Sequence, residues 1–245
     1  MLDGKTYWIV GASEGLGRAL AEEMDAAGAK LILSARSQDR LEALAGALKH
    51  TARAVPCDVT SSDSVLAAWQ SVGDIDGVIY MAGAYEPMRA QDWNGDDVAR
   101  ICEVNFTGAT RILSHVVPSF TKRGAGHIVI VGSLAGYRGL PGAIGYGASK
   151  AAIMHLAETL EADLWHTPVR VQLFNPGFIR TRLTDKNQFS MPFLMEPEEA
   201  AKHMINGLRK DRFQFDFPWI FSLFFRLGRF LPSPLFYRMF APKPK

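Results

Sequence analysis

The sequence contains few of the residues that mark secreted, metal-binding or membrane-spanning proteins. It has only two cysteines, Cys57 and Cys102, which form no disulfide framework and suit a reducing compartment. Its six histidines show no ligand spacing, and no cluster of Cys and His indicates zinc. No uncharged apolar run reaches the roughly 18 residues of a membrane-spanning helix. The start of the chain also lacks a basic and then apolar signal segment. We therefore expect a cytoplasmic protein without a metal.

Charge is nearly balanced over the whole chain but uneven along it. The 27 Lys and Arg residues exceed the 25 Asp and Glu residues by two. Residues 209–245, however, contain eight Lys or Arg and only two Asp, against nineteen and twenty-three over residues 1–208. The basic residues form no stripe with stacking aromatics, which argues against nucleic acid as a partner. With no internal repeat or linker, the length indicates a single domain over 1–245, with 213–245 as an apolar and basic extension.

What the sequence does contain is a regular alternation of strand and helix patterns. Short apolar runs rich in β-branched residues predict strands at 5–10, 30–35, 52–57, 76–81, 126–132, 168–174 and 212–217. Apolar residues at helical spacing predict helices at 15–28, 38–49, 61–72, about 96–120, 145–166 and 197–209. Such alternation indicates an α/β fold whose parallel sheet is covered by helices on both faces.

A glycine-rich loop joins the first predicted strand to the first predicted helix. It reads Gly11-Ala-Ser-Glu-Gly-Leu-Gly17. A strand before such a loop and a helix after it are the context that a dinucleotide-binding loop requires. Glycines let the backbone approach a pyrophosphate, and the N-terminus of the helix offers it free N–H groups. The alternative is a tight turn between strand and helix that binds nothing.

A second motif follows the strand predicted at 126–132. Ser133 ends this strand, and ligands bind outside the carboxyl ends of the strands in an open α/β sheet. Tyr146 and Lys150 lie four residues apart near the start of the next helix and therefore share one face. An adjacent ammonium group and the helix dipole both favour the phenolate. The spacing thus predicts that the pKa of Tyr146 is lowered toward the range of a general acid–base catalyst. The alternative is a buried tyrosine beside a lysine that snorkels to the surface.

Six further positions complete a pattern with these two motifs. They are Ala82, Gly83, Asn105, Pro176, Gly177 and Thr181. Together with the glycine loop, the serine and the Tyr-x-x-x-Lys pair, their order and spacing resemble the short-chain dehydrogenase/reductase family over residues 2 to about 210. The resemblance implies a Rossmann-type doubly wound sheet with the strand order 3-2-1-4-5-6-7. It also implies a homodimer or homotetramer that binds NAD or NADP and acts on a small-molecule carbonyl or alcohol.

The resemblance also assigns roles to individual residues. The catalytic set that it implies is Asn105, Ser133, Tyr146 and Lys150. The cofactor-binding set that it implies is Gly11, Ser13, Glu14, Gly15, Leu16, Gly17, Arg36, Asp58, Val59, Ala82, Gly83, Tyr146, Lys150, Pro176, Gly177, Ile179 and Thr181. In the family, the asparagine interrupts its helix and holds a water in a proton relay that runs from the tyrosine through the ribose and the lysine. The segment after the Pro-Gly pair holds the nicotinamide carboxamide.

Two departures from the family pattern concern the ends of strands. Val10 stands where the family usually has threonine, which removes one side-chain hydrogen bond near the glycine loop. Tyr80 and Met81 replace the usual pair of asparagines before Ala82, whose amides brace the strand ends in the family. The sequence therefore predicts weaker bracing at this place, although all four catalytic positions are filled.

The identity of the cofactor depends on the end of the second predicted strand. An NAD-preferring fold places Asp or Glu about 20 residues after the glycine loop, where this chain has Ala35 and then Arg36. A guanidinium suits the 2′-phosphate of NADP, so we favour NADP(H) and keep NAD(H) as the alternative. Glu14 argues mildly for NAD, and Arg36 as a plain surface residue is a further alternative. Asp58 resembles a family residue that contacts the adenine, or else it begins the next helix.

The substrate pocket is expected between the 134–145 loop and the segment after Phe178. That segment is rich in Met and Phe, which favours an apolar carbonyl compound; the alternative is that these side chains only cap the edge of the sheet. Residues 213–240 contain eleven of the 26 aromatic residues. Within them, 219–231 predict a basic amphipathic helix that Pro232 and Pro234 end. Its apolar face combines Trp219, Ile220, Leu223, Phe224, Leu227 and Leu231. This helix either packs on its own domain or a second subunit, or makes peripheral contact with a membrane.

Two classes of function follow from these patterns. The favoured one is an NADP(H)-dependent oxidoreductase that interconverts a ketone or aldehyde and an alcohol, with an apolar substrate. Tyr146 would transfer the proton, Ser133 would orient the carbonyl, and Lys150 would hold the ribose. The alternative is a non-catalytic NADP(H)-binding module that regulates assembly or membrane docking. An isomerase or epimerase on the same scaffold is a third and weaker option, because one fold supports many chemistries.

Overall fold

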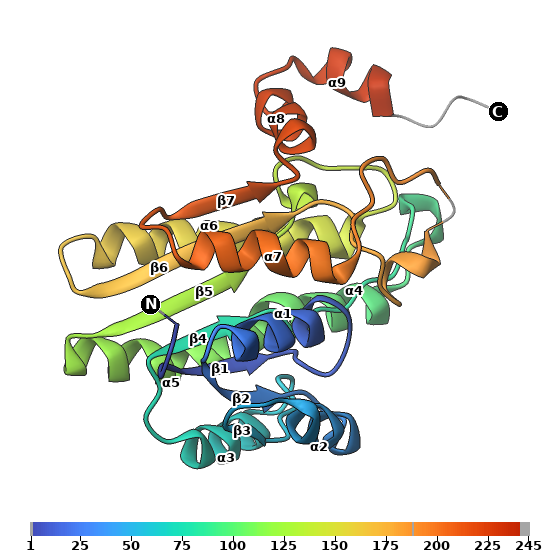
Figure 1. Cartoon of the computed structure of the whole chain (residues 1–245). Coiled ribbons are helices and arrows are strands. Elements are labelled where there is room, and N and C mark those ends of the chain that lie inside the picture. The colour runs from blue at the N-terminus through green and yellow to red at the C-terminus, as the bar shows by residue number, and fades with distance from the viewer. Residues whose placement is uncertain (1, 188, 241–245) are drawn as a thin grey trace.

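The chain folds around one seven-stranded sheet, shown in Figure 1 from a computed structural model that describes residues 2–187 and 189–240. All neighbouring strands pair in parallel, in the order β3-β2-β1-β4-β5-β6-β7. The strands are β1 (Thr6–Val10), β2 (Lys30–Ser34), β3 (Ala52–Ala54), β4 (Gly77–Tyr80), β5 (Gly126–Val131), β6 (Val169–Pro176) and β7 (Gln214–Phe217). The predicted fold class and strand order are therefore confirmed.

Helices cover both faces of this sheet (Figure 1). One layer consists of α1 (Gly15–Ala26), α2 (Gln38–Ala47) and α7 (Pro197–Leu208), and the other of α3 (Ser62–Val72), α5 (Gly108–Arg123) and α6 (Ile144–Leu164). Successive residues of β1 enter opposite layers: Trp8 and Val10 pack with the α3–α5–α6 side, and Tyr7 and Ile9 with the other. A parallel strand that is buried on both faces needs this nearly continuous apolar run.

The helix predicted at about 96–120 is interrupted in the structure. It consists of α4 (Gly95–Cys102), a π-helical turn (Glu103–Thr107) and α5. Within the turn, the side chain of Asn105 bonds to the chain after β4, and the hydroxyl of Tyr80 donates to the carbonyl oxygen of Val104. These tertiary contacts set the turn, and π-bulges of this kind often mark functional sites. Helical periodicity alone did not reveal the interruption, since it continues on both sides.

Several other element boundaries differ from the prediction, most clearly those of β3 and of the tail helix. β3 ends at Ala54 instead of residue 57, although the N–H groups of Val55 and Cys57 still donate to the carbonyl oxygens of Leu33 and Ala35. The predicted tail helix at 219–231 ends earlier, as α8 (Trp219–Gly228), and a further helix, α9 (Ser233–Phe240), follows it. Pro234 does not prevent α9, because it lies in the first turn, where the missing N–H would have no helical partner.

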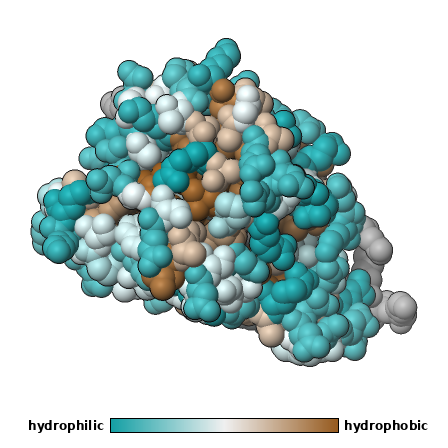
Figure 2. Space-filling view, turned by 90° about the horizontal axis from the view of Figure 1, so that it is seen from below, coloured by the Kyte–Doolittle hydropathy of each residue, from teal (hydrophilic) through white to brown (hydrophobic). Residues whose placement is uncertain are grey.

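The surface at the two edges of the sheet differs in character. Figure 1 places α2, α3 and β3 at one edge, and β7, α8 and α9 at the other. Seen from the β3 side, the molecule is covered mostly by hydrophilic residues, with apolar groups showing in a few places near the middle (Figure 2). Among the described residues, most of the exposed large apolar side chains belong to residues 219–239, at the β7 edge.

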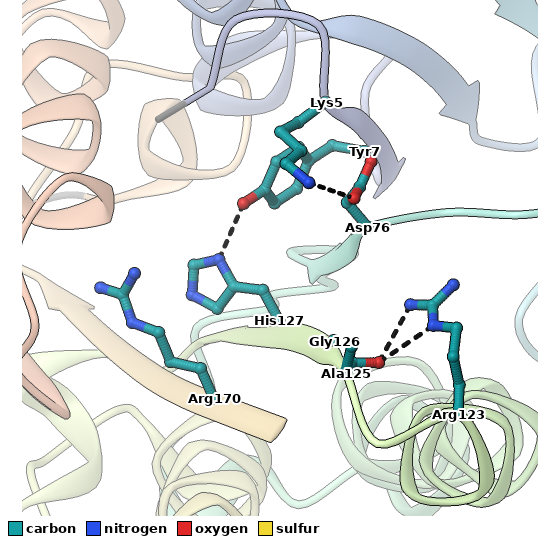
Figure 3. A pocket seen from close by; sticks show the side chains of 8 residues that line it. All are labelled: Lys5, Tyr7, Asp76, Arg123, Ala125, Gly126, His127 and Arg170. Carbon is teal, nitrogen blue, oxygen red and sulfur yellow. Dashed lines mark hydrogen bonds and ion pairs between the residues drawn. The ribbon is translucent and has the colours of Figure 1, made fainter. Parts of the chain in front are cut away.

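An open cavity of about 440 Å³ lies at the amino ends of β1, β5 and β6, away from the glycine loop (Figure 3). His127 forms a buried network there: its Nδ1 lies 2.9 Å from the Tyr7 hydroxyl and its Nε2 lies 3.1 Å from Gln172 Oε1. The Gln172 amide nitrogen donates to three backbone carbonyls, which leaves Oε1 to accept from Nε2. The Tyr7 hydroxyl therefore donates to Nδ1 of a neutral imidazole. Burial and the charge of Arg170 lower the pKa of His127 to about 3.

This network predicts a specific loss of stability in acid. Because the folded pKa of His127 lies below its unfolded value near 6.5, the unfolded chain takes up this proton first as the pH falls. The stabilisation is present above about pH 6.5 and is lost between about 6.5 and 3. We expect the free energy of unfolding, measured with urea across this range, to fall more steeply for the wild type than for His127→Leu. Equal slopes would show that His127 titrates normally in the folded state.

Candidate active site

Strand β5 and helix α6 bring the serine, tyrosine and lysine together at the carboxyl edge of the sheet. Ser133 lies two residues after the end of β5 and is buried, and its hydroxyl accepts a hydrogen bond from the N–H of Ala135 at 3.1 Å. Tyr146 and Lys150 lie one turn apart on α6, with the lysine Nζ 5.8 Å from the centre of the tyrosine ring. The buried Nζ donates to the carbonyl oxygen of Val131 at 2.9 Å. The ammonium is thus held beside the end of the strand that carries Ser133.

Burial decides the acidity of this group of side chains. It raises the pKa of Tyr146, and a hydrogen-bonding interaction with Ser133 opposes that rise. It also lowers the pKa of Lys150 to about 8. The sequence predicts that the lysine and the helix dipole lower the pKa of the tyrosine, and the direction of that prediction is wrong: desolvation of the phenolate is the larger effect. At neutral pH, Tyr146 is consequently a protonated phenol that can donate to a carbonyl oxygen.

Asn105 acts as a brace between the chain after β4 and helix α6. Its buried side chain accepts from the N–H of Ala84 at 2.6 Å and donates to the Ala84 carbonyl at 3.0 Å. It also donates to the hydroxyl of Ser149 at 2.9 Å, and that hydroxyl donates to the carbonyl oxygen of Tyr146. All these bonds orient the backbone around the tyrosine. The role in a water relay that the resemblance implies stays a prediction.

The glycine loop is tightly packed at three positions, two of them against backbone and one against a side chain. A Cβ on Gly11, whose φ is +102°, would lie 2.6 Å from the N atom of Ala82. A Cβ on Gly17 would lie 2.0 Å from the carbonyl oxygen of Gly11, and one on Gly15 would lie 2.9 Å from a methyl group of Thr181. Only glycine fits such positions. The loop therefore has the tight turn and the close helix–strand packing that a dinucleotide-binding loop needs.

The structure separates the charged residues around this loop into two groups. The carboxylate of Glu14 accepts from Arg40 at 2.9 Å and from Arg182 at 2.6 Å. Arg36 is exposed after β2. Burial acts to raise the pKa of Asp58, but the hydrogen bonds from Thr60 and the charge of Arg36 together lower it below its usual value. Asp58 accepts from both the N–H and the hydroxyl of Thr60. Arg36 and Asp58 thus lie near each other, and Asp58 holds the turn before α3.

The remaining predicted cofactor residues lie around the loop at the carboxyl ends of the strands. The N–H of Gly177 donates to the Phe217 carbonyl at 2.7 Å, and Ile179 pairs with Met195 in an isolated bridge. Both contacts hold the segment that leads to Thr181, which touches the glycine loop at Gly15. The other members of the predicted set are Ser13 and Leu16 in the loop, Val59 after β3, Ala82 and Gly83 after β4, and Pro176 at the end of β6.

Tyr80 restores the bracing that the sequence predicts to be weakened. Its buried side chain donates to the carbonyl oxygen of Val104 in the π-helical turn, where it takes the place of the family's asparagine amides. A Cβ on Gly108, just after that turn, would lie 2.7 Å from the Tyr80 hydroxyl. The strand end and the turn that carries Asn105 are therefore held together by a different side chain.

The sequence analysis did not identify Tyr85, which lies beside Tyr146 in the site. The ring of Tyr85 meets the Tyr146 ring edge to face, with centroids 5.0 Å apart. Its hydroxyl donates to Asn187 Oδ1 at 2.7 Å, and Lys186 pairs with Glu86. These bonds tie the loop after β4 to the segment after Thr181. The position of Tyr85, three residues after Ala82 at a strand end, was the signal that could have found it.

Fold and site together define a doubly wound nucleotide-binding protein with a Ser-Tyr-Lys group at the carboxyl ends of its strands. Comparison with known proteins gives the family. Residues 5–190 match the model described as short chain dehydrogenase, and this chain belongs to that family. Among the described residues, no group of three His, Cys, Asp or Glu side chains is placed to hold a metal ion.

Individual relatives agree with this assignment. An uncharacterized oxidoreductase from Myxococcus xanthus is 38% identical over 239 residues, which cover 95% of this chain and 94% of the relative. A short-chain dehydrogenase from Sphingobium yanoikuyae, solved in complex with NADPH, has a TM-score of 0.81 at 26% identity and covers 94% of this chain and 97% of its own. One from Burkholderia phymatum, in complex with NAD, reaches 0.85 at 24% identity over 93% of both chains, a likeness of fold.

Proposed function

We propose that the protein is an NADP(H)-dependent oxidoreductase that interconverts a ketone or aldehyde and an alcohol. The observation that carries the proposal is the grouping of Ser133, Tyr146 and Lys150 at the strand ends, beside a glycine loop that tolerates no Cβ at three positions. Ser133 follows β5, Tyr146 and Lys150 lie on α6, and Ser133 and Lys150 are buried. Such a rigid arrangement suits catalysis.

The described residues fit a nicotinamide dinucleotide. The N–H groups at the start of α1 and the close packing of Gly11, Gly15 and Gly17 suit the pyrophosphate. Lys150 would hold the ribose, and the backbone of Ile179 with the side chain of Thr181 would hold the carboxamide. When bound, the cofactor would supply or accept a hydride at its nicotinamide ring.

The protein's own residues would handle the proton and the carbonyl oxygen. Tyr146, a protonated phenol at neutral pH, would donate its proton to the substrate oxygen in reduction and take it back in oxidation. Ser133, which already interacts with that phenol, would give a second hydrogen bond to the same oxygen and orient it. Lys150 would keep positive charge next to the site, because its pKa of about 8 leaves it mostly protonated at pH 7.

The wall of the site favours an apolar substrate. Phe178 contacts the rings of Phe189 and Phe221, with centroids 5.8 Å and 5.7 Å away, and Phe193 meets Phe221 at 5.6 Å. Phe189 and Phe193 are about half exposed. An aromatic surface of this kind beside polar catalytic groups is typical of sites that bind the apolar part of a ligand.

A screen of carbonyl compounds tests the proposed reaction directly. Oxidation of NADPH is followed by its absorbance with short and long aliphatic aldehydes, cyclic ketones and aromatic ketones. We expect turnover with at least one class, and a higher kcat/KM for the more apolar members of that class. A protein that binds NADPH tightly but turns over none of them would be the regulatory module instead.

The preference for NADP rests on Arg36 and predicts a selective loss of affinity. Arg36→Ala removes the guanidinium near the expected 2′-phosphate, so we expect the Kd for NADPH to rise about 10- to 100-fold, as for the loss of a charged hydrogen bond. The Kd for NADH should change little. Arg209→Ala, which removes an exposed charge at the end of α7, is the control. If both cofactors lose affinity equally in the Arg36 variant, the 2′-phosphate lies elsewhere.

A further inference from the structure

The last two described helices expose a large apolar surface. Figure 1 shows α8 and α9 beyond the β7 edge of the sheet. Nine of the fourteen large apolar side chains that are exposed among the described residues lie between Trp219 and Met239. We call the most prominent of them the outer face, which consists of Trp219, Ile220, Leu223, Leu227, Phe230 and Leu235. Their exposed fractions range from 45% for Leu223 to 82% for Phe230.

The outer face is not needed to attach α8 to the domain. The opposite side of the helix does this through Ser222, Phe225 and Gly228, which are all buried. Phe221, which is also on α8, contacts the ring of Phe178 with centroids 5.7 Å apart. The apolar face that the sequence predicts therefore exists, but it points outward. Contiguous exposed apolar surface of this kind marks an interaction site.

Cations and aromatic rings accompany the outer face. Arg229, directly after α8, and Arg238, on α9, are exposed, and residues 218–245 contain no Asp or Glu. Arg226 on α8 is also exposed, but it pairs with Asp216 at 3.7 Å. Trp, Phe and Leu beside arginine are typical of helices that lie in the headgroup region of a membrane. Helices of ten and eight residues are far shorter than a bilayer is thick. In the part of the chain described, no helix has the length and hydropathy to cross one.

We propose that the outer face docks on the surface of an anionic lipid bilayer. The charges favour lipid over a second copy of the chain. In a two-fold contact the same patch meets itself, so Arg229 and Arg238 of both copies would approach each other without a carboxylate from 218–245 to pair with. Anionic headgroups supply that missing charge and attract arginine near the membrane surface.

Docking would bring the active site to the lipid. Phe221, on the inner side of α8, contacts Phe178 and Phe193 in the wall of the site. Arg138, from the loop between Ser133 and Tyr146, donates to the carbonyl oxygens of Gly228 and Leu231 and lies 4.1 Å from the centre of the Phe236 ring. The loop that joins Ser133 to Tyr146 is thereby attached to both helices that would touch the membrane. This geometry suits a substrate that is dissolved in the bilayer.

Vesicle co-sedimentation of the full chain tests the proposal without using its enzymatic activity. The probes are vesicles of phosphatidylcholine alone and vesicles that contain phosphatidylglycerol as well. We expect the wild type to sediment with the anionic vesicles and to be released by high salt. The variant Trp219→Ser/Leu227→Ser/Phe230→Ser should lose at least about tenfold in partition coefficient. Arg229→Gln/Arg238→Gln should lose most of the preference for anionic over neutral vesicles.

A matched control separates docking from general surface hydrophobicity. Trp165 is as exposed as Trp219, at 68% against 70%, but lies just after α6. Trp165→Ser should leave vesicle binding unchanged, and NADPH binding confirms that each variant is folded. Failure of the folded wild type to bind anionic vesicles would overturn the proposal. So would a dimer, detected by ultracentrifugation, that the triple variant dissociates while vesicle binding is unchanged, because the face would then join two copies.

Discussion

Tyr146→Phe is expected to lower kcat by about 10²- to 10⁴-fold, the contribution typical of a positioned general acid–base group. The substitution removes only the hydroxyl, so the ring contact with Tyr85 remains and the affinity for NADPH should be unchanged. Steady-state rates with the best carbonyl substrate give kcat, and a fluorescence titration gives the Kd for NADPH. Because burial raises the pKa of Tyr146, the phenol stays protonated near neutral pH. We therefore expect the wild type to lose no reductase activity there through ionisation of this group.

Tyr85→Phe is the matched control for this experiment. Tyr85 lies against the same ring, but its hydroxyl donates to Asn187 instead of facing Ser133. Removing it costs one hydrogen bond in the wall of the site, so kcat should fall by much less than in the Tyr146 variant. Comparable losses in the two variants, or near-normal activity in Tyr146→Phe, would show that the phenol of residue 146 is not the proton donor.

Gly17→Ala is expected to abolish tight cofactor binding. The new Cβ would lie 2.0 Å from the carbonyl oxygen of Gly11, a distance that forces α1 away from the loop. We expect the Kd for NADPH to rise by more than about 100-fold, together with a loss of stability of about 1–3 kcal/mol from overpacking. Titration with NADPH and urea denaturation measure the two effects.

Gly46→Ala serves as the control for a methyl group added to a helical glycine. Gly46 lies in α2, where a Cβ would meet nothing within 4 Å. Because alanine favours the helix over glycine, this variant should be as stable as the wild type or more so, by up to about 1 kcal/mol. It should bind NADPH normally. If Gly17→Ala also binds NADPH normally, the loop does not form the cofactor site.

The sequence was sufficient for the parts of the fold that depend on local pattern. Alternating strand and helix periods predicted the parallel sheet, and the spacing of Ser133, Tyr146 and Lys150 placed them at one edge of it. The family resemblance implied that Asn105 interrupts its helix, but helical periodicity did not predict the π-helical turn, because the turn depends on bonds to Ala84 and from Tyr80 at another strand end. Helical periodicity carries no information about such long-range contacts.

Two further properties depend on burial, which a sequence does not give. The pKa of Tyr146 is raised because the phenol is desolvated, whereas the sequence showed only the nearby lysine. The helix at 219–228 was correctly predicted as amphipathic, but the direction of its apolar face was left open. The structure turns this face outward, since Phe225 and Gly228 already fill the contact with the domain. Whether α8 and α9 meet lipid is a proposal that the vesicle experiment decides.

The most direct test of the account is a crystal structure with NADPH and a carbonyl substrate or its alcohol. The measurement is the distance from the substrate oxygen to Tyr146 Oη and to Ser133 Oγ. The account predicts that both lie within about 3.2 Å of that oxygen, the reach of a hydrogen bond, with the pyrophosphate against Gly11–Gly17. A substrate oxygen bound by other groups, or a cofactor that avoids the glycine loop, would contradict it.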